Sequence, residues 1–293
     1  MRKYKIAGIQ VGAYAGNYEK NWTKIYQTTE EVILKERPEV VAYSELMHVP
    51  YFASLKDDHF FSFAEEMNGH TVRKVSDIAV TFGVYIVGTL FEKEVTSQDV
   101  NYFNTAFICS PISGVIGKYR KVHLPCVNNT SLTTNEKYYF EKHGGGGKEF
   151  PVFTLDNGLK VGILICFDRS FPEAWRALSI QGVDLIIVPT ATYGFRKDLF
   201  IQELQVRAME NNVFVLCVNK AGKEKLKGET KERHHFGSSC MINPFGEIIQ
   251  CSNDEEWSSV VGVIDLKENN ISRQRVDWNK ERKPGVYHPY LHP

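Results

Sequence analysis

Residues 161–175 read VGILICFDRSFPEAW, and this stretch decides the fold class. Its first five residues, Val161–Ile165, are all apolar, as in a strand that is covered on both faces. Ser170–Glu173 fits a capping box with Pro172 in the first turn, which predicts that a helix starts here. A buried strand that leads through a tight turn into a helix is typical of an α/β protein.

Cys166 lies on that turn, at the carboxyl end of the strand. Ligands of open α/β sheets bind at this edge. The start of a helix also favours the thiolate, which is the nucleophilic form of cysteine. Cys166 is therefore a candidate nucleophile. The alternative is a buried structural cysteine, because most free cysteines behave as small apolar residues.

On both sides of this stretch, apolar runs of strand length alternate with segments of helical spacing. The runs are rich in β-branched residues and are bounded by Gly, Pro, Asn or charged residues. Strands are predicted at Lys5–Val11, Val40–Ser44, Val84–Leu90, Asn104–Cys109, Leu159–Ile165, Asp184–Val188, Val213–Val218, Ser239–Ile242 and Val260–Asp265. Helices are predicted at Tyr18–Lys35, Val72–Phe82, Pro172–Gln181 and Arg196–Asn211.

The order strand-helix-strand-helix-strand-strand occurs twice, which predicts two related halves packed as one domain over residues 1–270. No Pro- or Ser-rich linker separates the halves. Residues 271–293 are charged, contain proline and end PYLHP. This composition predicts an arm, which is either a disordered end or docks on a partner subunit.

The composition is that of an ordinary globular protein, with 43% hydrophobic and 24% charged residues among 293. Lys plus Arg and Asp plus Glu are both 35, so the net charge is zero, and no global field attracts nucleic acid. No stretch approaches the roughly 20 apolar residues that span a bilayer. Gln10 and Gly12 interrupt the N-terminal MRKYKIAGIQ before a signal peptide can form, which predicts a cytoplasmic protein.

The spacing of cysteine and histidine does not favour a metal site. None of the six cysteines forms a CxxC pair, so a zinc ribbon or a thioredoxin-like motif is not expected. His143 and the pair His234–His235 lack HExxH spacing, and we interpret them as polar loop residues.

Residues 124–148 form the one long stretch without a clear element, which is typical of a functional or mobile loop. The run Gly144–Gly147 within it resembles a phosphate cradle. No GxxxxGK[ST] pattern follows, however, and we predict a flexible loop.

Three further charged residues are candidates for the site. Glu45 follows the strand Val40–Ser44 among apolar neighbours, where a carboxylate can act as a general base, or it turns to solvent. In an extended segment Lys121 lies on one face with Tyr119, opposite Lys118 and Arg120, although edge lysines are common. Glu136 lies among three aromatic residues in the long stretch, where a surface glutamate is the alternative.

Together, these residues and their contexts resemble the nitrilase superfamily of carbon–nitrogen hydrolases. The resemblance covers almost the whole chain. It runs through KIAGIQV, SEL with Glu45, KYRKVHLP with Lys121, EKYYF with Glu136, ICFDRSFPE with Cys166, RAMENNVFVLCVN and FGSSCMINPFGEII. It implies a single-domain α/β fold, a four-layer α-β-β-α sandwich. It also implies homodimers or higher homo-oligomers, with the C-terminal arm packing across the subunit interface.

The resemblance further implies a Glu-Lys-Cys triad and no metal or other cofactor. Cys166 attacks the carbon, and Glu45 moves the proton from the thiol to the departing nitrogen. Lys121 and the backbone N–H of Phe167 stabilise the oxyanion. Glu136 matches the family's second glutamate, which positions substrate and Lys121. The partner of such a site is a small-molecule amide.

The substrate is predicted from the residues that follow the nucleophile. Arg169 is similar to the arginine with which N-carbamoyl-amino-acid amidohydrolases bind the α-carboxylate. Their motif often has a second arginine beside it, where this chain has Ser170. His123 resembles another residue of that pocket, and Phe167, Thr190 and Ala191 are also expected to bind substrate. The alternative for Arg169 is a structural ion pair with Glu173 or Asp168.

N-carbamoyl amino acids are therefore the predicted substrates. Carbamoylputrescine amidase, ω-amidase and aliphatic amidase activities stay open as alternatives within the family. A true nitrilase is less favoured, because ICFDRSFPE lacks the cysteine-tryptophan motif of that branch. A non-enzymatic binding module is disfavoured because cysteine, lysine and glutamate are all present.

Overall fold

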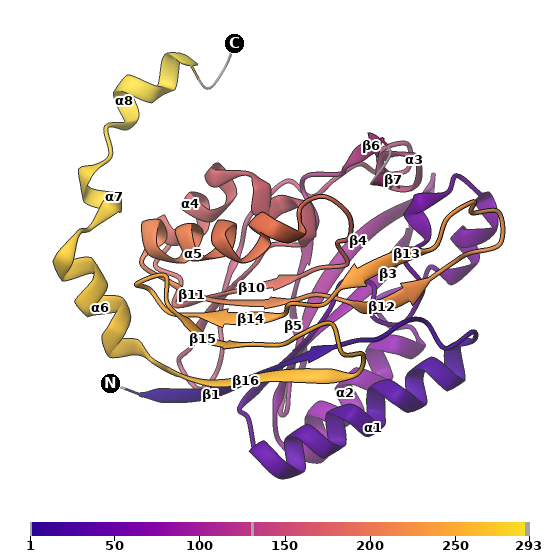
Figure 1. The fold of residues 1–293 in the computed structure, drawn as a ribbon, viewed down its shortest axis with the longest axis horizontal. Helices are drawn as coiled ribbons and strands as arrows, with labels where there is room; N and C mark the ends of the chain where they lie inside the picture. Colours follow the sequence, from indigo (N-terminus) through magenta and orange to yellow (C-terminus); the bar gives the residue numbers. More distant parts are fainter. Residues whose placement is uncertain (1, 130–131, 291–293) are drawn as a thin grey trace.

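The computed structural model describes residues 2–129 and 132–290. Within them, two six-stranded sheets pack face to face between layers of helices (Figure 1). The first sheet has the order β16-β1-β2-β3-β4-β5 and the second the order β15-β14-β11-β10-β9-β8. The first sheet comprises β1 (Lys3–Gln10), β2 (Val40–Tyr43), β3 (Tyr85–Val95), β4 (Val100–Ser110), β5 (Gly114–Arg120) and β16 (Ser258–Asp265). The second comprises β8 (Val152–Thr154), β9 (Lys160–Ile163), β10 (Leu185–Pro189), β11 (Phe214–Val218), β14 (Cys240–Ile242) and β15 (Ile248–Cys251).

Each sheet is built on three parallel strands, β1-β2-β3 in one and β9-β10-β11 in the other, flanked by antiparallel strands. Helices connect the parallel strands, as such crossovers require. They are α1 (Tyr18–Glu36) and α2 (His70–Phe82) in the first half, and α4 (Pro172–Ile180) and α5 (Phe200–Asn211) in the second. The predicted pair of related halves is thus visible in the topology.

Three apolar clusters separate the four layers. The central one joins the facing sides of the two sheets, where Ile6 and Val40 meet Ile163 and Leu185. The sheets approach so closely that a Cβ built on Gly8 lies 2.7 Å from Val218 Cγ2. The second cluster packs α1 and α2 on the first sheet, and the third packs α4 and α5 on the second. The molecule is the expected α-β-β-α sandwich.

Residues 124–148 differ from the prediction, because they contain regular structure. Two short strands, β6 (Cys126–Asn128) and β7 (Thr133–Asn135), form a hairpin, and α3 (Glu136–Phe140) follows directly. A second hairpin, β12 (Ala221–Glu224) and β13 (Arg233–Phe236), was also not predicted. Strands of three or four residues carry too short a pattern to be recognised in the sequence.

The glycine run Gly144–Gly147 is a loop, as predicted, and its last two residues are closely packed. It packs against the strand end that carries Lys121. A Cβ on Gly147 would lie 2.0 Å from the carbonyl oxygen of Arg120, and one on Gly146 would lie 2.6 Å from that of Val122. These glycines are needed because the two backbones approach closely.

The chain after β16 forms three helices in succession, α6 (Leu266–Arg275), α7 (Trp278–Glu281) and α8 (Pro284–Tyr287). α6 runs through position 271, where the arm was predicted to begin. Asn279 of α7 holds the tail to α4 through hydrogen bonds with Arg176 and Ser179. Beyond it, α8 stands away from the sandwich (Figure 1). No helix in the described part of the chain is long and apolar enough to cross a bilayer.

Candidate active site

Cys166 begins a 3-10 helix, Cys166–Ser170, three residues after β9 ends at Ile163. Its φ of +47° lies in the left-handed region, which costs a non-glycine residue on the order of 1–3 kcal/mol. The Asp168 carboxylate stabilises the turn by accepting a hydrogen bond from Ile165 N at 3.0 Å. Backbone strain of this kind is concentrated at functional sites.

The predicted capping box at Ser170–Glu173 is wrong. The residue that precedes α4 is Phe171, and no side chain caps this helix. The intervening 3-10 turn moves Ser170 away from the helix start. Its hydroxyl instead accepts a hydrogen bond from Arg196 Nη1 at 2.7 Å. Pro172 does occupy the first turn of α4, as predicted.

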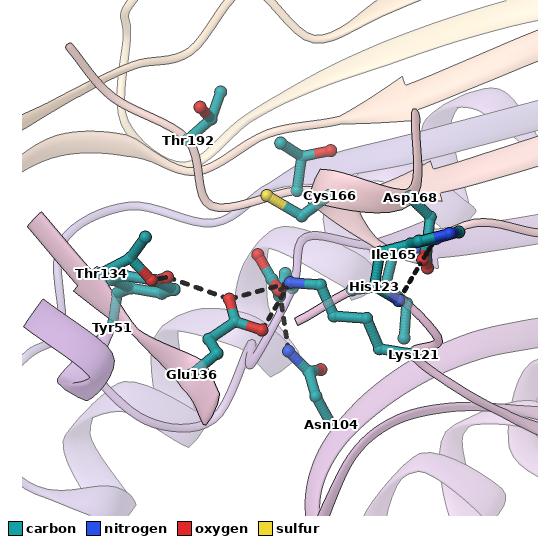
Figure 2. A network of polar contacts seen from close by, with 12 residues as sticks. Tyr51, Asn104, Lys121, His123, Thr134, Glu136, Ile165, Cys166, Asp168 and Thr192 are labelled. Atoms are coloured by element: carbon teal, nitrogen blue, oxygen red, sulfur yellow. Dashed lines mark hydrogen bonds and ion pairs between the residues drawn. The ribbon is translucent and has the colours of Figure 1, made fainter. Parts of the chain in front are cut away.

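Lys121 joins the two glutamates in one buried network (Figure 2). Its Nζ lies 2.7 Å from Glu45 Oε1 and 2.7 Å from Glu136 Oε2. Lys121 follows β5, Glu45 follows β2, and Glu136 opens α3. The side chains of Lys121 and Glu45 are both 0% exposed. Sequence segments far apart thus converge where the strands of the first sheet end.

Neutral groups complete the network around the two carboxylates. Asn104 Nδ2 donates to Glu45 Oε1 at 2.8 Å. The Tyr51 hydroxyl donates to Glu136 Oε1 at 3.0 Å and lies 2.6 Å from the Thr134 hydroxyl. Glu45 Oε2 has no hydrogen-bond partner among the described residues, which leaves it an available acceptor.

Burial and charge together set the protonation of these groups. Burial raises the pKa of the Cys166 thiol to about 12, and the Glu45 charge adds to this while Lys121 and Arg169 oppose it. Burial likewise raises the pKa of Glu136 to about 7. Lys121 opposes this rise, and the Glu45 charge adds to it. Burial disfavours the charged Lys121, but Glu136 and Glu45 outweigh it and raise its pKa. The arrangement at rest is a thiol beside a permanent ammonium.

A small cavity opens beside the nucleophile. Its volume is about 90 Å³, which is below the roughly 300–1,000 Å³ of pockets that bind drug-sized ligands. The lining residues are Tyr51, Pro125, Val127, Leu132, Thr134, Cys166, Phe167, Arg169, Ala191, Thr192, Tyr193, Phe195 and Arg196. Cys166 is one of these lining residues, and the Lys121 charge acts on its thiol. A small molecule in this cavity therefore meets the thiol.

The predicted substrate-binding residues divide into two groups. Phe167, Arg169 and Ala191 line the cavity. His123 and Thr190 do not line it. His123 Nδ1 lies 2.8 Å from Asp168 Oδ1, and its ring stacks on Phe171 at 3.6 Å. The Thr190 hydroxyl bonds to Val188 O, and its carbonyl accepts from Glu45 N at 3.3 Å.

Arg169 makes an ion pair, although not with either residue that was considered. Its Nε lies 3.2 Å from Glu203 Oε2, on α5. Its Nη1 donates to Cys166 O at 2.9 Å. Glu203 was not considered because it lies 34 residues further along the chain, and only the packing of α5 brings it close.

Asp168 is the principal residue that the sequence analysis missed. Besides the Ile165 amide, it binds the Tyr119 hydroxyl at 2.6 Å and the His123 amide at 2.9 Å. The sequence did indicate this role, because Asp168 is the third residue of CFDRS, and a carboxylate at the third position of a turn can cap that turn. Tyr51, Thr134 and Arg196 carried no comparable local signal. Among the described residues, no His, Cys, Asp and Glu cluster is suited to hold a metal ion.

Comparisons with known proteins give a consistent result. Residues 5–274 match the carbon-nitrogen hydrolase family. A nitrilase of Pyrococcus abyssi is 31% identical, over 89% of this chain and 90% of the relative. An N-carbamoylputrescine amidase of Solanum lycopersicum is 29% identical, over 85% and 82%. A beta-ureidopropionase of Arabidopsis thaliana is 28% identical, over 81% of this chain and 58% of the relative.

The fold has close matches among solved structures. A carbon-nitrogen hydrolase of Helicobacter pylori superposes with a TM-score of 0.89 over 99% of each chain, at 23% identity. At this identity the likeness concerns the fold.

Proposed function

This chain belongs to the carbon–nitrogen hydrolase family, and from that premise we propose that Cys166, Glu45, Lys121 and Glu136 are its catalytic residues. The family acts on amides, and the proposed enzyme is a thiol amidohydrolase that cleaves a non-peptide C–N bond. The observation that carries the proposal is the buried network of Lys121 with both glutamates, which lies beside a strained cysteine that lines a cavity.

The first half of the reaction is acylation of the enzyme. The raised pKa of Cys166 means that its thiol is protonated at rest, so a base must remove the proton during attack. The unpartnered Glu45 oxygen supplies that base. As Cys166 Sγ bonds to the carbon, the ammonium of Lys121 and the Phe167 N–H stabilise the oxyanion. Glu45 passes its proton to the departing nitrogen, and a thioester remains on Cys166.

The second half is hydrolysis of that thioester. Glu45, again ionised, takes a proton from water, which adds to the thioester carbon. Collapse of the second oxyanion releases the product and returns the proton to Cys166 Sγ. Glu136 pairs with the Lys121 ammonium group at 2.7 Å, and the Tyr51 hydroxyl donates a hydrogen bond to Glu136. These contacts keep the ammonium in place through both steps.

We propose N-carbamoyl amino acids as the substrates. The balanced reaction is RNH–CO–NH2 + H2O → RNH2 + CO2 + NH3. Two of the relatives described above, the N-carbamoylputrescine amidase and the beta-ureidopropionase, support an N-carbamoyl group. Two arginines in the cavity wall support an acidic R group. The alternative substrate is N-carbamoylputrescine, which the similarity to the Solanum lycopersicum amidase favours. ω-Amidase and aliphatic amidase activities are further alternatives.

Ammonia release from purified protein tests this function. The panel is N-carbamoyl-D- and L-amino acids, N-carbamoyl-β-alanine, N-carbamoylputrescine, α-ketoglutaramate and a simple nitrile. Cys166→Ala is expected to lower turnover by at least about 10³-fold, because it removes the nucleophile. Cys251→Ala, at an exposed cysteine on β15, is the control and keeps full activity. Turnover at the wild-type rate by Cys166→Ala contradicts the mechanism.

We also propose that the protein forms homodimers through α5 and the C-terminal arm. α5 exposes Val206 and Met209 to solvent, and the arm exposes Val286, Tyr287 and Tyr290. Arg207 and Glu210 form an ion pair on the same helix, at 2.7 Å. Apolar side chains on a helix and on an arm that stands away from the body favour a partner subunit.

A further inference from the structure

We propose that Arg196, rather than Arg169, binds the substrate carboxylate and selects small ureido acids over neutral and cationic ureas. The inference rests on the proposed amidohydrolase function and deepens it. Its basis is the position of Arg196 in the wall of the cavity that Cys166 also lines. Arg196 lies between β10 and α5, outside the cysteine motif.

Arg169 is poorly placed to bind a substrate. Its side chain is 2% exposed, and it is held on three sides. Nε pairs with Glu203 at 3.2 Å, Nη1 binds the Cys166 carbonyl at 2.9 Å, and the guanidinium lies over the Phe200 ring at 5.0 Å. Moving Arg169 toward a ligand breaks contacts that fix the nucleophile turn. We therefore infer that Arg169 positions Cys166.

Arg196 has the accessibility that Arg169 lacks. Its side chain is 28% exposed. Nη1 donates to the Ser170 hydroxyl at 2.7 Å, and Nη2 pairs with Glu203 Oε1 at 2.9 Å. These bonds orient the guanidinium and leave other N–H donors without a partner among the described residues. A preorganised guanidinium with free donors is suited to a carboxylate.

The local charge balance also favours an anionic ligand. Glu203 is the carboxylate that Arg169 and Arg196 share, one on each oxygen. Among these three side chains, two positive groups and one negative group leave an excess of one positive charge, separate from the Lys121 network. Asp168 accepts hydrogen bonds from Tyr119, Ile165 and His123 and pairs with neither arginine. A substrate carboxylate neutralises this excess, whereas an ammonium group is repelled.

The remaining cavity wall suits a short hydrocarbon linker. Phe167, Phe195 and Tyr193 line the cavity together with Cys166 and Arg196. Aromatic walls accept methylene groups and offer a flexible chain few polar partners. The implied substrate class has a ureido or amide carbon at Cys166, a few methylene groups and a carboxylate at Arg196.

Three ureas with the same four-carbon skeleton test this inference. N-carbamoyl-4-aminobutyrate is anionic, butylurea is neutral, and N-carbamoylputrescine is cationic. The wild-type enzyme is expected to have its highest kcat/KM for the anionic urea. Arg196→Ala is expected to lower that value by about 10-fold or more, mainly through KM, because one charged contact is lost. Hydrolysis of butylurea is expected to change by less than about 3-fold.

Matched variants separate binding from structure. Lys197→Ala removes an exposed cation next to Arg196, outside the cavity wall, and is expected to leave all three activities unchanged. Arg196→Lys is expected to recover part of the lost affinity for the anionic urea. An equal loss for the neutral and the anionic urea in Arg196→Ala overturns the inference, as does a wild-type preference for the cationic urea.

Failure of the proposed function gives a different result. If the wild type hydrolyses none of the ureas, dissociation constants are measured by calorimetry with Cys166→Ala and with Cys166→Ala/Arg196→Ala. Tighter binding of the anionic urea that disappears in the double variant supports Arg196 while the proposed reaction fails. Absence of such a difference, or of any binding, overturns the assignment of Arg196.

Discussion

Glu45 and Glu136 share the ammonium group of Lys121, so the ionised network carries one excess negative charge. Burial raises the pKa of Glu136 to about 7, and the Glu45 charge adds to this rise while Lys121 opposes it. As the pH falls through about 7, the network takes up a proton, and its capacity to act as a base declines. Activity on the proposed mechanism is therefore expected to fall on the acid side.

The pH profile of kcat/KM tests this coupling. In the wild type, an acid limb is expected near pH 7. In Glu136→Gln, the group that takes up this proton is absent, and Glu45 is the only carboxylate of the network that still pairs with Lys121. The acid limb is expected to shift to lower pH, with a reduced maximum. Glu141→Gln, on the exposed residue that follows α3, serves as the control. An acid limb that stays near pH 7 in Glu136→Gln contradicts the assignment.

Asp168 is the second prediction at the residue scale. Its buried carboxylate accepts from the Tyr119 hydroxyl and from the amides of Ile165 and His123. Asp168→Ala leaves these donors unpaired and is expected to lower the free energy of unfolding by about 3 kcal/mol. Urea denaturation measures the change. Asp198→Ala, at an exposed position, is the control, and an equal effect of both substitutions argues against this role.

Among the elements, β5 depends on the glycine run that covers its end. Gly147 N donates to Lys121 O at 2.8 Å, so the run also fixes the backbone of the proposed catalytic lysine. Gly147→Ala places a methyl group against the Arg120 carbonyl. It is expected to cost roughly 2 kcal/mol of stability and to lower kcat by displacing Lys121.

Thermal unfolding and steady-state kinetics measure these two effects. Gly285→Ala is the matched control, because a Cβ at Gly285 meets no atom within 4 Å and its φ is not positive. Stability and kcat that stay at wild-type values in Gly147→Ala show that the two backbones can separate without cost.

At the scale of the whole molecule, the two sheets assemble the site jointly. Glu45 and Lys121 come from strand ends of the first sheet, and Cys166 comes from the second. A backbone hydrogen bond from Glu45 N to Thr190 O joins the two sheets at this point. The geometry of the site therefore depends on the packing of one half on the other.

The proposed dimer belongs to the same scale. Val206→Glu places a charge on the exposed apolar face of α5 and is expected to convert the assembly to monomers. Light scattering after size exclusion measures the mass. Val80→Glu, on the exposed face of α2 in the other helical layer, is the control and is expected to retain the assembly. A monomeric wild type, or an unchanged mass in Val206→Glu, refutes this interface.

Much of the fold could be predicted because its patterns are local. The apolar runs at β2, β10 and β11 gave the parallel strands almost to the residue. β3 and β4 extend beyond their predicted ranges because their outer parts, Phe91–Val95 and Val100–Phe103, contain polar residues. The hairpin β6–β7 was missed because it is stabilised by the pairing of its two strands with each other, and its sequence contains no apolar run that would predict a strand.

The sequence by itself determined the α/β class, the turn that carries Cys166, and the inward face of Tyr119 and Lys121. Each of these depends on residues a few positions apart, where periodicity and turn chemistry act directly. Only the tertiary structure decided that Lys121 meets Glu45 across 76 positions, that Asp168 fixes the turn, and that Arg196 reaches Ser170. Such contacts arise when buried charges find partners as the sheets pack, and local sequence does not encode that pairing.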